Sequence, residues 1–407
     1  MKNFEWSKST VTHMHIELSN YCNAACPMCP RFVDSTARTR PDLKLESISI
    51  DQFKTWFPPE FMKNMLRILF CGTHGDPMMA KDIIEITEYI QETAPRCTIV
   101  YHTNGGMRDA NFWKSFGEKL VSKNTDHRVT FSIDGLEDTN HLYRRNVKWS
   151  KLMENVKAYL STGARARWEF LVFGYNEHQI EEAKEYSKLL GFRDIEIKRA
   201  LGFDTLKNGE LKSKGVYDRD GNLEYIIDPP TNLDFLNRTD FQKINRDVEP
   251  KKDLGYLKDI KKGYHPKVEH RVDTFVEEEL PHWNTYLLQY QDMEINCKSC
   301  LKDQRSEIYV SCNGIVFPCC YVGTRVDSSI DLYEDTQLRV HIRKFGIDKF
   351  DLKKTNINEI IKNGYLDKVY TETWTKEKYS QGKLSYCAMT CGSNSEIDRI
   401  YSRNDKS

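Results

Sequence analysis

Cys22-Asn23-Ala24-Ala25-Cys26-Pro27-Met28-Cys29 places three thiols at the spacing C-x3-C-x2-C, directly after a segment of alternating apolar residues at 12–18. A four-iron cluster that receives protein thiolates at only three of its irons keeps the last iron open for a small molecule. The stretch therefore predicts a metal site that lacks one protein ligand, and this missing ligand is its most informative property.

The composition limits the class of protein. The 407 residues suffice for a large α/β domain and a smaller one, and 60 basic and 60 acidic residues give a formal net charge of zero. Charges of both signs alternate along the chain, so nothing predicts a nucleic acid partner. No apolar run reaches the roughly 18 residues that span a bilayer, and residues 1–10 lack the apolar core of a signal peptide. We expect a cytoplasmic protein that binds no membrane.

The cysteines form two groups. Three of the 12 lie at 22–29 and seven lie between Cys297 and Cys391, while Cys71 and Cys97 stand apart and are interpreted as small buried apolar residues. A dense disulfide framework belongs to small secreted domains, which this chain is not. The sequence therefore predicts two metal sites in different parts of the chain.

Strand and helix patterns alternate over residues 11–200. Such an alternation predicts a parallel sheet with right-handed crossovers, and six strands are too few for a complete eight-unit barrel but suit an open or partial one. The expected strands are 13–18, 67–71, 98–103, 128–134, 167–173 and 194–199, and the expected helices are 49–57, 81–92, 110–122, 150–161 and 177–190.

Ligands of parallel α/β proteins bind at the carboxyl ends of the strands. The triplet and the loops at 72–77, 103–106 and 132–135 all follow strands, so we expect them to meet at one mouth. Because alternate residues of a strand face opposite sides, the pattern also predicts polar side chains that face inward. These include His15, Glu17, Ser132, Asp134, Arg167, Glu169, Glu196 and Lys198, which line a ligand cavity or pair with one another as internal salt bridges.

The last part of the chain is organised around its cysteines. Residues 201–293 are polar and rich in turns, and they form a substrate-covering insertion or a bridge. Asn313-Gly314 predicts a β-hairpin beyond a strand at 307–311. Thiols on this hairpin and the later pair Cys387 and Cys391 favour a four-thiolate metal site, with structural zinc as the alternative.

With these motifs the chain resembles a radical S-adenosylmethionine (SAM) enzyme that carries a twitch or SPASM-type auxiliary domain. Cys22, Cys26 and Cys29 match the CxxxCxxC signature of that superfamily. The resemblance implies an α/β fold, a partial (β/α)6 TIM-like barrel followed by a small cysteine-rich auxiliary domain with a β-hairpin. The implied boundaries are 1–200 for the barrel, 201–293 for the intervening segment and 294–407 for the auxiliary domain.

The resemblance also assigns the cofactor site. Gly75-Asp76-Pro77 resembles the Gly-Gly-Glu-Pro loop that receives the methionine amino group, with His74 in place of the first glycine and Asp76 in place of the glutamate. Asn104 lies in a Thr-Asn-Gly motif. The positions of Ser132 and Asp134 imply contacts with SAM, and that of Met28 implies an apolar contact with the adenine.

For the second cysteine group the resemblance implies one auxiliary [4Fe-4S] cluster. Cys300, Gly314 and Cys319 fit the pattern C-x(9–15)-G-x4-C, and Cys387 and Cys391 complete the set, although they are spaced CxxxC instead of CxxC. Cys297 is the main rival of Cys300. A second auxiliary cluster that uses Cys297, Cys312 and Cys320 is the alternative.

The implied reaction is reductive cleavage of SAM to methionine and a 5′-deoxyadenosyl radical, which removes hydrogen from an unactivated C–H bond. An electron donor such as flavodoxin or ferredoxin is the implied partner. Dehydrogenation or epimerisation would follow, with Cys320 or Cys319 as a hydrogen donor. The inward-facing Glu169, Glu196, Lys198 and His15 are candidates to hold the substrate or take a proton.

The first predicted strand begins at residue 13, so we expect no leader-binding domain before it and favour a small polar, sugar- or nucleotide-like metabolite as substrate. A peptide-modifying maturase that forms a crosslink or an epimer is the alternative. A non-catalytic iron–sulfur or zinc protein is the alternative of another class, and it requires four protein ligands where the triplet offers three.

Overall fold

The computed structural model divides into two compact units that are interleaved in sequence. Unit 1 comprises Met1–Tyr21, Pro41–Ile99 and Glu279–Ser407, and unit 2 comprises Cys22–Arg40 and Val100–Glu278. The structure describes residues 4–33, 35–41, 43–121, 126–203, 211–232, 235, 240–243, 293–295, 297, 306–327, 342, 345–376 and 381–392.

Four strands of unit 1 lie in the order β11-β10-β1-β2. Strand β1 (His13–Ile16) is parallel to β2 (Arg67–Phe70) on one side and to β10 (Glu307–Val310) on the other. Strand β11 (Val316–Phe317) returns antiparallel to β10. Gly314 has a φ of +84° in the turn between them, which a glycine adopts without strain. The hairpin predicted from Asn313-Gly314 is therefore confirmed.

Short helices connect and follow these strands. Helix α1 begins with a capping box, in which the Ser49 hydroxyl accepts from the Gln52 amide and the Gln52 side chain accepts from the Ser49 amide. The helices of unit 1 are η1 (Trp6–Lys8), α1 (Ile50–Trp56), α2 (Pro59–Met62), η2 (Pro77–Met79), α3 (Ile83–Thr93), α11 (Cys320–Asp327), η6 (Ile347–Phe350), α13 (Ile357–Lys362), η7 (Asp367–Thr371), α14 (Glu372–Trp374) and α15 (Ser385–Cys391).

Unit 2 continues the alternation of strands and helices. Strands β3, β4, β5 and β6 are parallel neighbours, and β9 is antiparallel to β6. Strand β3 begins in unit 1 and ends in unit 2. The elements are β3 (Thr98–Thr103), α4 (Ala110–Val121), β4 (Arg128–Ser132), α5 (Asn140–Tyr143), α6 (Trp149–Leu160), β5 (Arg165–Val172), η3 (Glu177–Gln179), α7 (Ile180–Leu190), β6 (Asp194–Arg199) and β9 (Asp240–Lys243), with a separate hairpin of β7 (Lys214–Tyr217) and β8 (Leu223–Ile227).

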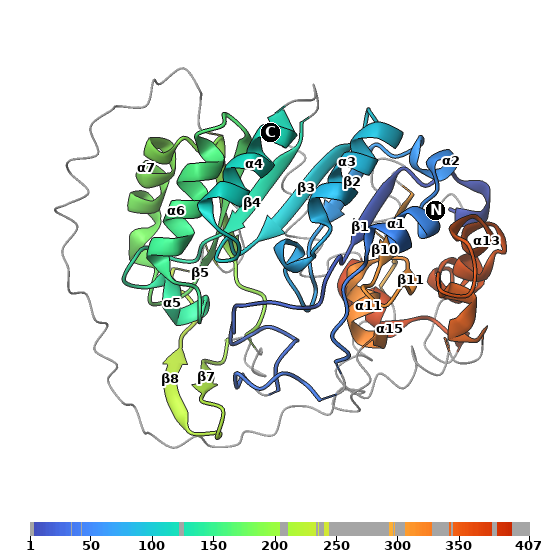
Figure 1. The fold of residues 1–407 in the computed structure, drawn as a ribbon. Helices are drawn as coiled ribbons and strands as arrows, with labels where there is room; N and C mark the ends of the chain where they lie inside the picture. The colour runs from blue at the N-terminus through green and yellow to red at the C-terminus, as the bar shows by residue number, and fades with distance from the viewer. Residues whose placement is uncertain are drawn as a thin grey trace. The chain divides into compact units, whose positions relative to one another are not determined.

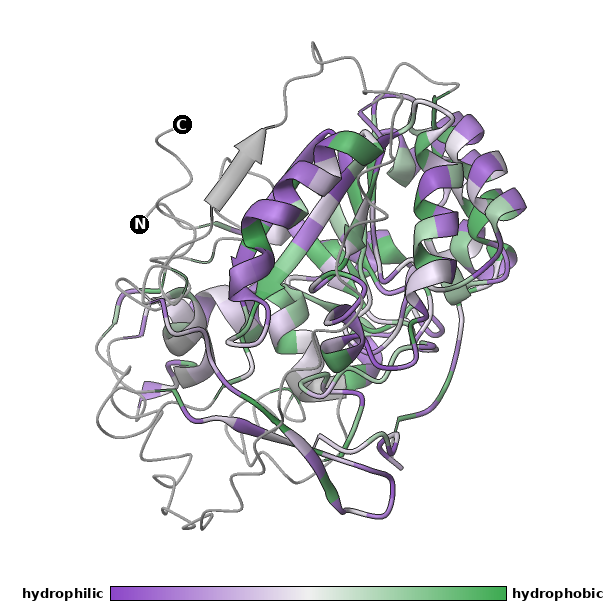
Figure 2. Ribbon diagram, turned by 90° about the vertical axis from the view of Figure 1, so that its left-hand side faces the viewer, coloured by the Kyte–Doolittle hydropathy of each residue, from purple (hydrophilic) through white to green (hydrophobic). Residues whose placement is uncertain are grey.

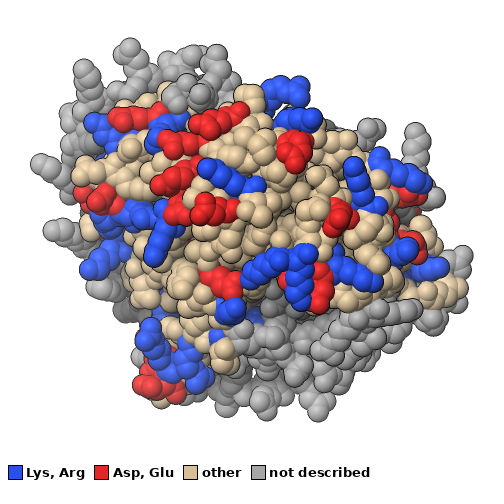
Figure 3. Space-filling model, turned by 45° about the vertical axis from the view of Figure 1, so that its right-hand side comes forward, with Lys and Arg blue, Asp and Glu red and all other residues tan. Residues whose placement is uncertain are grey.

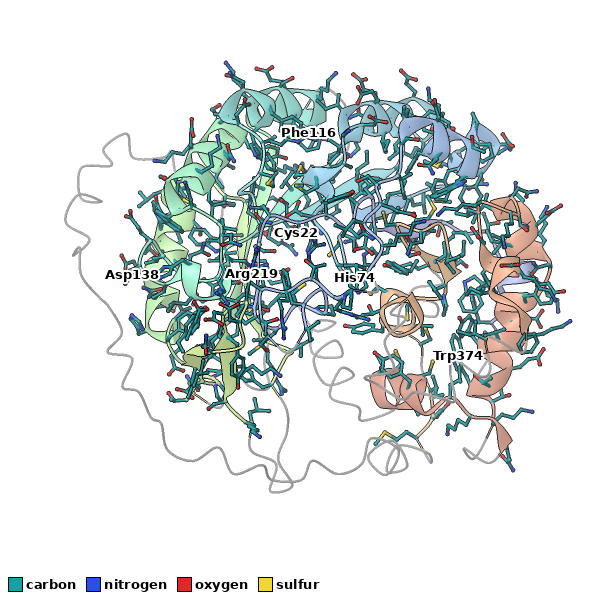
Figure 4. The ribbon with its side chains drawn as sticks, turned by 60° about the horizontal axis from the view of Figure 1, so that its bottom comes forward. Cys22, His74, Phe116, Asp138, Arg219 and Trp374 are labelled. Carbon is teal, nitrogen blue, oxygen red and sulfur yellow. The ribbon has the colours of Figure 1, made fainter. Side chains whose placement is uncertain are left out.

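Helices α4, α6 and α7 lie side by side along one face of β4 and β5 (Figure 1). Each helix carries hydrophilic and hydrophobic residues on different sides (Figure 2), which is typical of helices that cover a sheet. Phe116 of α4, labelled in Figure 4, contacts Tyr101 of β3 with ring centroids 5.1 Å apart, and both side chains are fully buried. An aromatic layer thus joins helix and sheet.

The predicted α/β fold is confirmed: six mainly parallel strands occur in sequence order with helices in the crossovers, and the hairpin follows near the carboxyl end. The domain boundaries at 200 and 293 stay predictions. On the face shown in Figure 3, basic and acidic side chains are interspersed. In the part of the chain that the structure describes, no helix is long and apolar enough to cross a membrane.

Candidate functional site

The triplet lies in unit 2 on the loop that follows β1 in sequence, and Figure 4 labels Cys22 on it. The Cys29 amide donates to the Cys26 carbonyl over 3.0 Å, and none of the three thiols is in a disulfide. Burial, together with the nearby Cys26, raises the pKa of Cys29 to about 12. The Cys29 thiol therefore ionises only beside positive charge, and coordination to iron would supply such charge, because a coordinating thiol is deprotonated outright.

Two nitrogen donors face the sulfurs of the triplet. Asn104 Nδ2 lies 3.7 Å from Cys22 Sγ and 2.9 Å from Asn23 Oδ1. Arg144 Nη1 lies 3.6 Å from Cys26 Sγ. Hydrogen bonds to the ligand sulfurs are one of the factors that set the potential of an iron–sulfur cluster. The donor set thus fits a cluster at the triplet, and the predicted residue Asn104 lies beside it.

Arg144 is fixed by a buried carboxylate. Asp134, which is fully buried, accepts from Arg144 Nε over 2.6 Å and from the Leu171 amide over 2.7 Å. Burial alone would lower the pKa of Arg144, but the charges of Asp134 and Cys26 hold it well above its usual value. Both oxygens of Asp134 are thus engaged within the protein. Sequence reasoning missed Arg144, although an inward-facing Asp134 needs a cation nearby.

Ser132 and Met28 occupy two further positions of unit 2. Ser132 is the last residue of β4 and pairs in register with Glu169 of β5. Met28 packs against Gly202, just beyond β6, where a Cβ atom would lie 2.5 Å from Met28 Sδ. The close packing at Gly202 restricts where the Met28 side chain can lie.

The loop Gly75-Asp76-Pro77 lies in unit 1 and packs on the backbone that precedes the triplet in sequence. A Cβ atom at Gly75 would lie 1.9 Å from the Ser19 carbonyl oxygen, and one at Gly72 would lie 1.9 Å from the Gly75 carbonyl oxygen. The Asp76 amide donates to the Tyr21 carbonyl over 2.9 Å, and its carboxylate accepts from the Met78 amide. Only glycine fits at positions 72 and 75, so a close backbone approach explains the motif.

The candidate catalytic residues of β5 and β6 form one ion-pair cluster. Lys198 Nζ lies 2.8 Å from Glu169 Oε2 and 3.9 Å from Glu196 Oε1, and Arg167 Nη1 lies 2.9 Å from Glu196 Oε2. Burial would raise the pKa of Glu169, but Lys198 and His102 lower it to about 2. The Glu169 carboxylate is therefore ionised at neutral pH. His15 lies in unit 1, where Nε2 is 2.7 Å from the Cys71 carbonyl oxygen.

Replacing Glu169 with glutamine is expected to destabilise the apo-protein at pH 7 by about 3 kcal/mol, the free energy that corresponds to a pKa lowered from 4.5 to about 2. Since the folded pKa lies below the unfolded one, this contribution is present above pH 4.5 and is lost as the pH falls toward 2. Urea unfolding of wild type and variant across this pH range measures the difference in their free energies of unfolding. This difference should become smaller at acid pH.

Glu181→Gln is the control, because its side chain is 83% exposed and pairs with Lys184 on the helix surface. It should change stability by less than about 0.5 kcal/mol at any pH. A Glu169→Gln effect that is equally large at pH 7 and pH 2.5 would mean that packing, and not charge, accounts for it.

Four cysteines of the second group lie around a small cavity in unit 1. Cys297, Cys319, Cys387 and Cys391 line it together with apolar and aromatic side chains such as Trp374, which Figure 4 labels. Burial and the neighbouring Cys391 and Cys387 raise the pKa of Cys319 well above its usual value. Four thiols thus face one small space.

The other cysteines of this region differ from those four. Cys300 lies outside the described residues. Cys312 donates its thiol to the Glu46 carbonyl over 3.0 Å, and Cys320 begins α11. The described residues contain no group of three or more His, Cys, Asp or Glu side chains placed to hold one metal ion. A four-iron cluster takes one thiolate at each iron, so its ligands need not converge on a single point.

The sequence was compared with known proteins. Residues 16–187 match the model of the radical SAM superfamily. No curated protein matches the chain. Similar solved structures include anSMEcpe with bound AdoMet (13% identity, 90% of this chain and 81% of that one, TM-score 0.49). Also similar is Streptococcus suis SuiB bound to S-adenosylmethionine, with 15% identity, coverage of 91% of this chain and 75% of that one, and a TM-score of 0.45. SuiB bound to precursor peptide SuiA has 14% identity, coverage of 91% and 74%, and a TM-score of 0.45.

Proposed function

We propose that this protein, whose residues 16–187 match the model of the radical SAM superfamily, is an enzyme that cleaves SAM reductively and abstracts hydrogen from a substrate. The observation that carries the proposal is the triplet Cys22, Cys26 and Cys29, three thiols with amide and guanidinium donors aimed at two of the sulfurs. Three thiolates leave one iron of a [4Fe-4S] cluster open. When bound, the cluster and SAM supply a 5′-deoxyadenosyl radical.

The chain's own residues hold and orient these groups. Cys22, Cys26 and Cys29 would ligate the cluster, and Asn104 and Arg144 would donate to the ligand sulfurs. The loop Gly75-Asp76-Pro77 would receive the methionine amino group on its backbone. Ser132 and Asp134 are assigned to the SAM site, Asp134 through the guanidinium that it holds, and Met28 to an apolar contact with the adenine.

We assign one auxiliary [4Fe-4S] cluster to unit 1. Cys297, Cys319, Cys387 and Cys391 line the same cavity, which supports Cys297 as a fourth ligand, while Cys300 lies outside the described residues. The lining is otherwise mainly apolar, and no thiol of the four is in a disulfide. The cluster would accept the electron of a substrate radical in a dehydrogenation. Cys320, which does not line the cavity, remains a candidate hydrogen donor for an epimerisation.

A small polar metabolite, sugar- or nucleotide-like, is the proposed substrate. The ion-pair cluster of Glu169, Lys198 and Glu196 supports this, because it places charges of both signs side by side on neighbouring strands. Hydroxyl and phosphate groups are recognised by such charge-assisted hydrogen bonds. A flavodoxin or ferredoxin is the proposed electron donor.

The test is anaerobic reconstitution with iron and sulfide, followed by addition of SAM and dithionite. We expect 5′-deoxyadenosine to form, and the variant with Cys22, Cys26 and Cys29 all replaced by alanine to form none. That variant should keep about four irons of the wild type's eight. If wild type forms no more 5′-deoxyadenosine than this variant, the proposal is overturned. Deuterium transferred into 5′-deoxyadenosine from a labelled sugar nucleotide, or from a labelled peptide, then identifies the substrate class.

A further inference from the structure

Glu17 is a buried carboxylate that none of the assignments above uses. It follows β1, its side chain is 1% exposed, and it lies in unit 1. Its Oε1 accepts from the His74 amide over 2.6 Å and from the Gly75 amide over 3.0 Å. Its Oε2 accepts from the Tyr309 hydroxyl over 3.0 Å. One carboxylate thus fixes two consecutive amides of the glycine loop.

The direction of these amides determines the direction of the carbonyls. In a planar trans peptide the N–H and the C=O point in opposite directions. Since the amides of His74 and Gly75 point at Glu17, the carbonyl oxygens of Thr73 and His74 face away from it. Two acceptors are therefore presented on the opposite side of the loop, where an ammonium group can be bound by backbone oxygens.

The charge of Glu17 is maintained by its neighbours. Burial alone would raise its pKa, but hydrogen bonds from His74 and Tyr309 and the charge of the His74 ring lower it. Glu17 is therefore ionised at neutral pH, and a hydrogen bond to an ionised acceptor is stronger than one between neutral groups. The loop conformation is held by charge-assisted bonds.

Tyr309 brings the carboxyl-terminal part of the chain into this network. Its hydroxyl also lies 3.1 Å from Thr73 Oγ1, and the side chain is 1% exposed. The ring stacks on Phe317 with centroids 6.2 Å apart. It also packs on Gly323 of α11, where a Cβ atom would lie 2.3 Å from the ring. The helix that follows Cys319 thus fixes the hydroxyl that holds Glu17.

We propose that Glu17 and Tyr309 are positioning residues for SAM, which orient the carbonyls of Thr73 and His74 toward the methionine amino group. Through Tyr309, the segment that carries the second cysteine group contributes to SAM affinity without touching SAM. This inference rests on the proposed function.

The test is SAM binding by the reconstituted protein, measured by calorimetry, with Glu17→Gln and Tyr309→Phe. Loss of a buried hydrogen bond to a charged group should raise the Kd for SAM at least about tenfold. Binding of 5′-methylthioadenosine, which lacks the amino acid part, should change less than about twofold. In the SAM cleavage assay the KM for SAM should rise more than kcat falls.

Two further variants separate positioning from stability. Tyr159→Phe removes another buried tyrosine hydroxyl, one that donates to the Arg165 carbonyl in unit 2, and should leave both affinities unchanged. Gly323→Ala keeps Tyr309 and Glu17 but displaces the ring, and should weaken SAM binding as Tyr309→Phe does. Iron content and melting temperature show that each variant is folded and loaded.

The outcomes distinguish this inference from the proposed function. If wild type cleaves SAM but Glu17→Gln and Tyr309→Phe bind SAM with an unchanged Kd, only this inference is overturned. The inference is also overturned if the variants bind SAM and 5′-methylthioadenosine more weakly by the same factor, because orientation of the amino group would then not be the cause. Wild type that neither binds nor cleaves SAM overturns both.

Discussion

Replacement of Cys297 with alanine is expected to lower the iron content of the reconstituted protein from about eight to about four irons per chain. Cys297 lines the cavity with Cys319, Cys387 and Cys391, so its loss leaves one iron without a protein ligand, at a site where no SAM would take the open position. Iron and acid-labile sulfide analysis, with Mössbauer spectra of ⁵⁷Fe-loaded protein, measures the change. Formation of 5′-deoxyadenosine without substrate should continue, because the triplet is untouched.

The neighbouring cysteines provide matched controls. Cys312→Ala removes a thiol that donates to a backbone carbonyl, and Cys320→Ala removes one outside the cavity lining, so both should keep about eight irons. The assignment of Cys297 fails if Cys297→Ala keeps its iron and Cys300→Ala loses it. About twelve irons in wild type would instead indicate a second auxiliary cluster.

Replacement of Arg144 with methionine is expected to destabilise the apo-protein by about 3 to 5 kcal/mol. Asp134 is fully buried and Arg144 is the cation that lies against it, so the variant leaves a buried carboxylate without its counter-charge. Guanidinium chloride unfolding at pH 7 measures the loss. The loaded variant should also cleave SAM more slowly, since the donor to Cys26 is gone.

The adjacent arginine is the control for this prediction. Arg145 pairs with Glu224, whose side chain is 39% exposed, so Arg145→Met should cost about 1 kcal/mol or less. Adding Asp134→Asn to Arg144→Met should recover part of the loss, because the unpaired charge is removed. Equal losses for Arg144→Met and Arg145→Met would contradict the role of the buried pair.

The fold could be predicted from the sequence because its signals are local. Period-two alternation identified strands such as β4 and β6, and Asn313-Gly314 identified the hairpin before β11. The triplet could be found because the spacing of its thiols is typical of metal ligation, and the glycine loop because close backbone approach fixes its residue types. Each of these signals is contained in a short segment of the sequence.

The partners of the predicted residues could not be found in this way. Alternation placed Glu17 and Asp134 inward, but it does not specify which side chain meets them. Cys26 and Arg144 are separated by 118 residues, and Glu17 and Tyr309 by 292. The assignment of Cys297 likewise depends on which described thiols face a cavity built by distant segments. Tertiary packing decides these contacts, and periodicity carries no information about it.

The parallel pairing of β10 with β1 also bears on how the chain folds during synthesis. Met14 is in register with Ile308, so one edge of the amino-terminal strand is covered only after nearly 300 further residues have left the ribosome. Until then β1 presents unpaired backbone groups, as any edge strand does, and such long-range parallel pairing forms slowly. The carboxyl-terminal strand therefore protects the edge of β1 from edge-to-edge aggregation in the completed chain, while in the nascent chain that edge is still uncovered.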